Sequence, residues 1–152
     1  MNYFPEQVFV GLQETPNEIS LIIPIAGCGH ACKGCHSPEY QHASNGVELT
    51  ETLYLDLLCR YADKVSCICF FSGEFEIEHY LTEAKFAGFK TALYSGYDKL
   101  WDMPWGVMNS LDFLKLGHYN EGLGGLADST TNQRMYRVDS NGLENITSEF
   151  WR

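Results

Sequence analysis

The chain has 152 residues, of which 45% are hydrophobic, so it is long enough for one domain with a buried core, which we place at residues 1–152. Its formal net charge of −10 argues against nucleic-acid binding, because Lys and Arg must neutralise a phosphate backbone. It has no run of about 18 apolar residues and no secretory leader pattern, so we expect a cytoplasmic protein with no membrane partner.

The N-terminal part predicts two strands followed by a cysteine-rich loop. Residues 7–12 have a short strand pattern that ends at a Thr-Pro-Asn turn. Residues 18–25 are almost continuously apolar, which is typical of a strand in a parallel sheet covered on both faces. The loop that follows contains Cys28, Cys32 and Cys35 in the spacing C-x3-C-x2-C, between glycines that permit tight turns.

Beyond this loop, helical and strand patterns alternate. Thr50 can cap a helix whose inward side holds Leu53, Leu57 and Leu58. The pattern then predicts a strand at 65–71, a helix at 76–87 stopped by Gly88, a strand at 89–94, a short helix at 98–103, a strand at 111–116 and a last strand at 134–138.

Short connections between alternating strands and helices favour a mostly parallel sheet with right-handed crossovers. About five alternating strands are too few for an eight-stranded barrel. We therefore expect an α/β fold, namely an open, partial (βα) barrel with its active site at the C-terminal ends of the strands.

Three thiols within residues 28–35 can converge on one soft metal centre. Structural zinc sites and most iron–sulfur clusters take four protein ligands, and the next cysteine is as far away as Cys59. Three thiolates would leave one iron of a cubane cluster open to a small molecule. The alternative from spacing alone is a Cys3His zinc site that adds His30 or His36.

The other cysteines are expected to be structural. Cys59 lies in a helical pattern, and Cys67 and Cys69 are two residues apart in a predicted strand, so they share one face. We interpret this pair as small buried apolar residues. In a reducing compartment, six cysteines indicate metal or thiol chemistry more than disulfides.

The C-x3-C-x2-C spacing just after a strand resembles the signature of the radical S-adenosylmethionine (SAM) superfamily. The segment AGCGHACKGCHSPE resembles, more narrowly, the activating proteins of anaerobic ribonucleotide reductase. The resemblance implies that Cys28, Cys32 and Cys35 ligate a 4Fe–4S cluster, whose fourth iron is chelated by the amino group and carboxylate of SAM.

Two further strand ends are similar to motifs of that superfamily. The first begins at Ser72 and reads S-G-E-F, where the family has a G-G-E-P-like motif that receives the amino group of SAM. The second begins at Ser95 and reads S-G, where the family has a Y-T-G turn near the methionyl group and ribose of SAM. Taken without the resemblance, both are ordinary turns. The cofactor-binding candidates are Ser72, Gly73, Glu74, Ser95 and Gly96.

The segment LDFLKLGHYNEGLGGLADSTTNQRMY, which starts at Leu111, resembles the C-terminal part of the activating proteins. There D-x-x-K-x-G-P-Y, G-G-L and T-N-Q-R follow in that order, although His118 and Thr130 stand here at two proline positions. The T-N-Q-R donors could bind a substrate peptide or the SAM carboxylate, or could form a surface turn. We assign no role to them or to the histidines.

The resemblance implies an activating enzyme. Its reduced cluster would cleave SAM to methionine and a 5′-deoxyadenosyl radical, and this radical would take hydrogen from a glycine of the partner, anaerobic ribonucleotide reductase. The resemblance also implies a flavodoxin-like electron donor. It implies no catalytic residue beyond the cluster ligands. The alternatives are another radical SAM enzyme, such as a pyruvate formate-lyase activase or a small-molecule rearrangement, and a zinc-stabilised binding module without catalysis.

Overall fold

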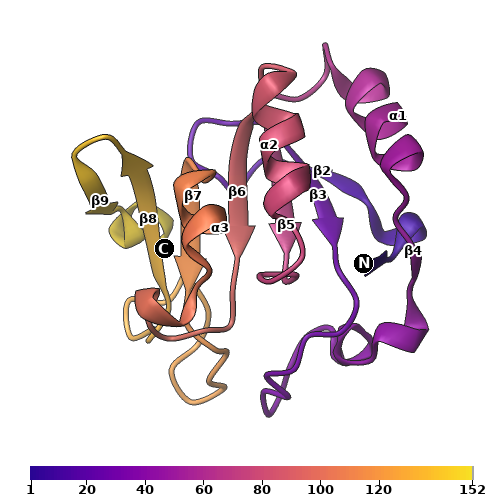
Figure 1. The fold of residues 1–152 in the computed structure, drawn as a ribbon. Helices are drawn as coiled ribbons and strands as arrows, with labels where there is room; N and C mark the ends of the chain where they lie inside the picture. Colours follow the sequence, from indigo (N-terminus) through magenta and orange to yellow (C-terminus); the bar gives the residue numbers. More distant parts are fainter. Residues whose placement is uncertain (152) are drawn as a thin grey trace.

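The computed structural model describes residues 1–151, which form an α/β fold around a mixed sheet (Figure 1). In this range the main sheet has seven strands: β2 (Phe9–Gly11), β3 (Ser20–Pro24), β5 (Cys67–Phe71), β6 (Lys90–Tyr94), β7 (Phe113–Leu116), β8 (Arg134–Asp139) and β9 (Gly142–Asn145). A separate pair joins β1 (Asn2–Tyr3) to β4 (Val47–Glu48).

Three α-helices lie in front of the sheet in Figure 1: α1 (Glu51–Tyr61), α2 (Glu78–Phe86) and α3 (Trp105–Asn109). Short 3-10 helices occur at η1 (Pro5–Gln7), η2 (Pro38–Gln41), η3 (Ala43–Asn45), η4 (Leu100–Asp102) and η5 (Thr147–Phe150). None of the helices formed by residues 1–151 is both long enough and apolar enough to cross a membrane.

The four central strands β3, β5, β6 and β7 are parallel, so their C-terminal ends lie at the same edge of the sheet. The outer pairings, β2 with β3, β7 with β8 and β8 with β9, are antiparallel. The predicted α/β class is confirmed, whereas the expected mostly parallel sheet is wrong, because three of the six pairings among the described strands of the main sheet are antiparallel.

The connections explain this mixture. A parallel neighbour needs a crossover, usually a helix, whereas the links before β3 and after β7 contain no helix in the described chain. The chain therefore turns back beside the strand that it has just left. The pairing gives no support to a (βα) barrel, since β2 and β9 are the two edges of the described sheet and do not pair with each other.

Both faces of the central strands are buried. Along β3, Leu21 and Ile23 pack in the core on the helix side, while Ile22 belongs to a second cluster on the opposite face. Burial on both faces accounts for the nearly continuous apolar run. Cys67 and Cys69 are fully buried in the second cluster, which confirms their interpretation as small core residues.

The first helix begins as predicted but turns a different face inward. The Thr50 hydroxyl accepts a hydrogen bond from the Leu53 N–H at 3.2 Å, which confirms the cap. Leu57 and Leu58 are buried, whereas Leu53 is 43% exposed and Tyr54 takes the inward position. The prediction for Leu53 is wrong, because Tyr54, which lies three and four residues before Leu57 and Leu58, shares the inward face with them.

Two elements in the C-terminal half were not predicted. The sequence predicts one short helix at 98–103, whereas the structure has η4 there and then a separate helix, α3, which begins directly after Pro104. Proline is well tolerated at the start of a helix because its fixed φ suits that position. Strand β9 pairs with β8 after a turn at Ser140 and Asn141. The predicted stop of α2 is confirmed, since Gly88 follows it with φ of +93°, a conformation that favours glycine.

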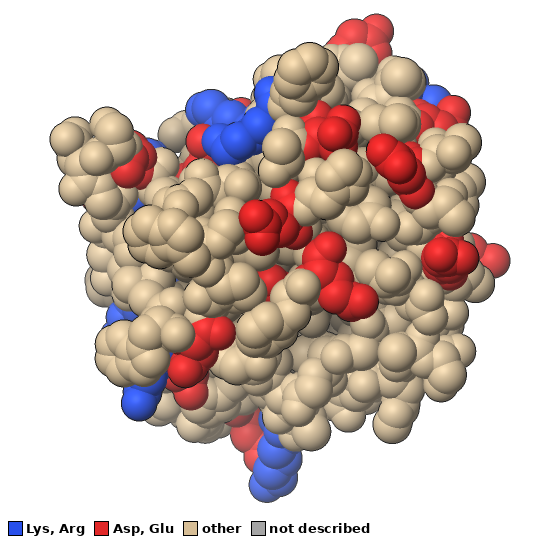
Figure 2. Space-filling model, in the orientation of Figure 1, with Lys and Arg blue, Asp and Glu red and all other residues tan. Residues whose placement is uncertain are grey.

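Figure 2 shows the helix face, with acidic side chains spread across it and basic ones near its margins. Exposed carboxylates of α1 include those of Glu51 and Asp56. This distribution gives the visible face a negative character, which matches the negative net charge of the whole chain.

Candidate metal and cofactor site

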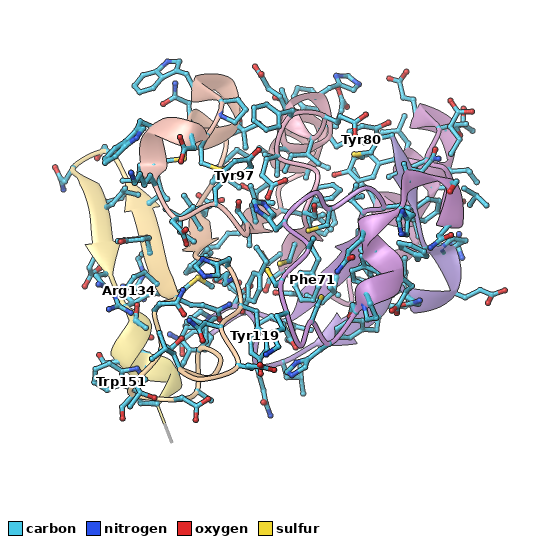
Figure 3. All side chains as sticks on the ribbon, turned by 90° about the horizontal axis from the view of Figure 1, so that it is seen from below. Phe71, Tyr80, Tyr97, Tyr119, Arg134 and Trp151 are labelled. Carbon is cyan, nitrogen blue, oxygen red and sulfur yellow. The ribbon has the colours of Figure 1, made fainter. Side chains whose placement is uncertain are left out.

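The C-terminal edge of the parallel strands brings the three predicted groups of site residues together. Figure 3 looks onto the molecule from this side, where Phe71, Tyr97 and Tyr119 lie about the centre and Trp151 near the margin. A cavity of about 470 Å³ opens here, within the range of roughly 300–1,000 Å³ that is usual for small-molecule sites. Its lining includes Cys28, Cys32, Cys35, Ser72, Ser95 and Gly96.

The cysteine loop is fixed to the rest of the molecule at its first residues. The N–H groups of Gly27 and Cys28 both donate to the carbonyl of Tyr40, at 2.7 and 2.9 Å. The hydroxyl of Tyr40 donates in turn to the Gln7 side chain at 2.8 Å. Ala31 has φ of +48°, so the loop holds a left-handed turn at a residue with a side chain.

The three loop thiols are free and partly exposed. Burial raises the pKa of the Cys28 thiol above its usual value. The nearby His30 backbone N–H and Ser72 hydroxyl act on this pKa in the opposite direction, and burial has the larger effect.

Three free thiols that line one cavity are the donor type that an iron–sulfur cluster takes. Among residues 1–151 no group of three or more His, Cys, Asp and Glu side chains is placed to hold one metal ion. In a cubane cluster each thiolate binds a different iron, so the cysteines stand around a space rather than meeting at a point.

Glu74 and Ser95 meet behind the cavity wall. The Ser95 hydroxyl donates to Oε1 of Glu74 at 2.7 Å and accepts from the Tyr97 N–H at 3.1 Å. Glu74 is only 6% exposed, and Nε2 of His30 lies 3.9 Å from the same Oε1. Of the predicted cofactor-binding residues, Ser72, Ser95 and Gly96 line the cavity, whereas Gly73 and Glu74 are not on its wall.

Close contact with neighbouring side chains explains why glycine follows the ends of both β5 and β6. Gly73 has φ of +89°, and a Cβ there would lie 2.9 Å from the side chain of Ile77. A Cβ on Gly96 would lie 2.7 Å from Cγ of His30, whose ring packs edge-on against Tyr97 at 4.6 Å. Gly96 is therefore the position that lets the cysteine loop close over the end of β6.

We predict that Gly96→Ala lowers the free energy of unfolding by about 1–3 kcal/mol, the usual effect of overpacking, because the new methyl group displaces the His30 ring. Urea unfolding followed by circular dichroism measures this. Gly29→Ala is the matched control in the same loop, since nothing lies within 4 Å of its added Cβ. Combining Gly96→Ala with His30→Ala should recover much of the loss, and strict additivity would contradict the contact.

Lys115 is a site residue to which sequence reasoning gave no role. It is 7% exposed, lines the cavity, and its Nζ donates to the carbonyls of Ser95 and Gly117 at 3.2 and 2.5 Å. Burial lowers its pKa to about 8, although negative groups, first that of Cys32, act against this shift. A lone lysine in the apolar strand LDFLKL was the signal available in the sequence.

The T-N-Q-R segment braces the loop that follows β7. Asn132 donates to the His118 carbonyl at 3.0 Å, and Gln133 donates to the Gly117 carbonyl at 3.3 Å. Arg134 bonds the carbonyls of Thr131 and Gln133, both at 2.7 Å. These contacts are structural, and Gln133 alone of the four lines the cavity.

Two other residues of the C-terminal motifs have partners that the sequence did not reveal. Nδ1 of His118 lies 2.8 Å from Oδ1 of Asp98, so the loops after β6 and β7 are joined there. Asp112 lies at the opposite end of the sheet, where both its oxygens accept from Lys85 at 2.9 Å and one also accepts from the Thr91 N–H. Asp112 therefore has no direct part in the site.

A second, more polar cavity of about 560 Å³ adjoins the first. The two share His30, Cys32, Gly96 and Tyr119 in their linings. The wall that belongs to the second cavity alone includes Asp98, His118 and the ion pair of Lys33 with Glu121, whose atoms lie 2.9 Å apart. The candidate site thus has an open, charged approach beside Cys32.

The chain was compared with protein-family models, with curated proteins and with solved structures, and none of the three comparisons found a match.

Proposed function

We propose that the protein is a cytoplasmic radical SAM activase that binds a 4Fe–4S cluster through Cys28, Cys32 and Cys35 and generates a glycyl radical on anaerobic ribonucleotide reductase. One observation carries the proposal: the C-x3-C-x2-C loop, Ser72 and the Ser95–Gly96 turn line a single cavity at the edge where the parallel strands end. Ligand sites of α/β sheets form at that edge.

A reduced 4Fe–4S cluster held by Cys28, Cys32 and Cys35 would supply the one electron needed to cleave SAM to methionine and a 5′-deoxyadenosyl radical, which could take hydrogen from a glycine Cα. The chain's own residues would bind SAM and orient it. The Lys115 ammonium is on the cavity wall and can pair with the carboxylate of SAM. Glu74, held by Ser95 behind the wall, favours the positive amino group by its charge.

The cavity also excludes part of the solvent. Its apolar side is formed by Phe71, Tyr94, Leu126 and Phe150, and the rings of Phe71 and Tyr94 stack with centroids 4.8 Å apart. The other side is open next to Cys32, through the polar cavity. A protein substrate can cover that opening while it presents its glycine, and a flavodoxin-like donor can deliver the electron before the substrate binds.

Anaerobic reconstitution tests the proposal. We expect about four Fe and four sulfide per chain, an EPR signal of the reduced cluster that changes when SAM is added, and formation of 5′-deoxyadenosine with dithionite. Adding the reductase should increase this yield and produce a glycyl-radical doublet that a Gly→Ala change in the reductase removes. Stoichiometric zinc without iron would sink the proposal. Transfer of deuterium to a small molecule, without reductase activation, would favour another radical SAM enzyme.

A further inference from the structure

We propose that three exposed aromatic side chains, those of Phe75, Trp101 and Trp105, form the docking surface for the protein substrate that presents its glycine to the cavity. We call these three residues the aromatic rim. The inference rests on the proposed function, which requires such a substrate, and it adds the surface that the substrate contacts. The matching surface of the substrate is an apolar patch surrounded by Lys and Arg side chains.

The side chains of the aromatic rim are largely exposed to solvent. Trp101 and Trp105 are both 79% exposed, and Phe75 is 65% exposed. Tryptophan is usually well buried, so the packing of the core does not account for two exposed tryptophans four residues apart. Exposed apolar patches mark interaction sites, and tryptophan is enriched among the residues that contribute most to binding energy.

The aromatic rim borders the opening of the site. Phe75 follows β5, and its ring packs edge-on against that of Tyr97, with the centroids 5.8 Å apart. Tyr97 is on the wall of the polar cavity, on the side of the molecule viewed in Figure 3. Trp101 lies between Lys99 and Asp102, which line the same cavity, and the Lys99 ammonium is 5.3 Å from the centroid of the Trp101 ring. A protein that covers this opening therefore also meets the aromatic rim.

The backbone that carries the two tryptophans is anchored to the core. Met103, in the middle of the segment from Trp101 to Trp105, is buried, and its sulfur lies 3.6 Å from the Ser95 hydroxyl. Val107, on α3, is buried as well. Because the segment is already held in place, little backbone entropy is lost there when a partner binds.

The charge around the aromatic rim is mainly negative. Segments 75–78 and 97–105 carry one basic residue, Lys99, and four exposed acidic residues, Glu76, Glu78, Asp98 and Asp102. The Glu78 side chain lies against Gly106, the residue next to Trp105. The helix face beside this region is acidic too (Figure 2).

This charge favours one kind of occupant. Opposite charges on two surfaces speed their association and exclude wrong partners. A second copy of this chain would bring a net charge of −10 and the same acidic surroundings, so it would be repelled. A basic surface on the protein substrate is complementary to the aromatic rim and its carboxylates.

The experiment measures glycyl-radical formation by EPR at increasing concentrations of the reductase, with dithionite as the reductant. It compares reconstituted wild type, Trp101→Ala, Trp105→Ala and the double variant. We expect the reductase concentration that gives half the maximal rate to rise by about tenfold in each single variant and further in the double variant. The yield of 5′-deoxyadenosine without reductase should stay at the wild-type level, because neither tryptophan lines either cavity.

Phe86→Ala is the matched control, because Phe86 is 92% exposed at the C-terminal end of α2, outside the aromatic rim. An equal loss in this control would overturn the inference. For wild type, the half-saturating concentration of reductase should rise with salt concentration, and Asp102→Asn should reduce this dependence. A wild type that is insensitive to salt would reject the basic partner surface.

Other occupants of the aromatic rim give different results. If the double variant loses activity only when a flavodoxin-like protein replaces dithionite, the rim binds the electron donor and the inference is wrong. It is also wrong if sedimentation shows a wild-type dimer that the double variant dissociates, with the reductase dependence unchanged. If wild type cleaves no SAM, the proposed function fails. If wild type activates the reductase and all variants saturate at the same concentration, the function stands and the docking role is rejected.

Discussion

Single replacement of Cys28, Cys32 or Cys35 by alanine is expected to abolish SAM cleavage and to reduce bound iron far below about four per chain. Each thiolate would hold a different iron of a cubane cluster, so the loss of one leaves an iron without its ligand. Among the described residues that line the cavity, these three are the only cysteines, so no other thiol can replace the missing one. Iron and sulfide analysis, the visible absorbance of the cluster and the yield of 5′-deoxyadenosine measure the effect.

Cys59→Ala is the control for this set. Cys59 is exposed on α1, away from the cavity, so its loss should leave iron content and cleavage at the wild-type level. Replacing Cys67 or Cys69 is a poorer control, because both are fully buried and a smaller side chain would leave a void in the core. Loss of the cluster in Cys59→Ala would show that the assigned ligand set is wrong.

The second large effect concerns stability and pH in the cluster-free protein. Burial lowers the pKa of Lys115 from 10.5 to about 8. Between these values the unfolded chain keeps a proton that the folded protein has released, so the free energy of unfolding rises with pH across this window. Relative to Lys115→Met, wild type should gain up to roughly 3 kcal/mol between pH 8 and 10.5.

Urea unfolding of both proteins at several pH values, in the presence of a reductant, measures this difference and cancels titrations that the two share. Lys64→Met serves as the control, because Lys64 is exposed after α1 and is solvated in both states. The free energy of unfolding of Lys64→Met should change with pH in the same way as that of wild type. If Lys115→Met shows the same rise as wild type, then Lys115 does not carry the effect.

The sequence predicted those parts of the fold that depend on interactions between residues close together in the chain. The apolar run of β3, the Thr50 cap and the glycine that ends α2 each depend on residues close together in sequence. The cysteine spacing likewise predicted that three thiols share one loop. The alternation of strands and helices predicted that Ser72 and Ser95, at the ends of neighbouring strands, lie near that loop.

The rest depends on contacts that the sequence does not display. No local signal says that Lys115 bonds the carbonyl of Ser95, which is 20 residues away, or that His118 faces Asp98 at the same separation. The direction of β8 was missed for a similar reason. Its orientation is set by a long helix-free link after β7, and strand patterns carry no information about direction.

The main sheet has a consequence for how the protein is made. Its spatial order, β2-β3-β5-β6-β7-β8-β9, is the order in which the ribosome produces these strands. Each new strand finds its partner as the exposed edge of what has already emerged, so no strand has to be inserted between two paired ones. The cysteine loop precedes Lys115 and the segment at 117–133 by about eighty residues of synthesis, so during translation the thiols are exposed to iron or oxidants before the rest of their cavity exists.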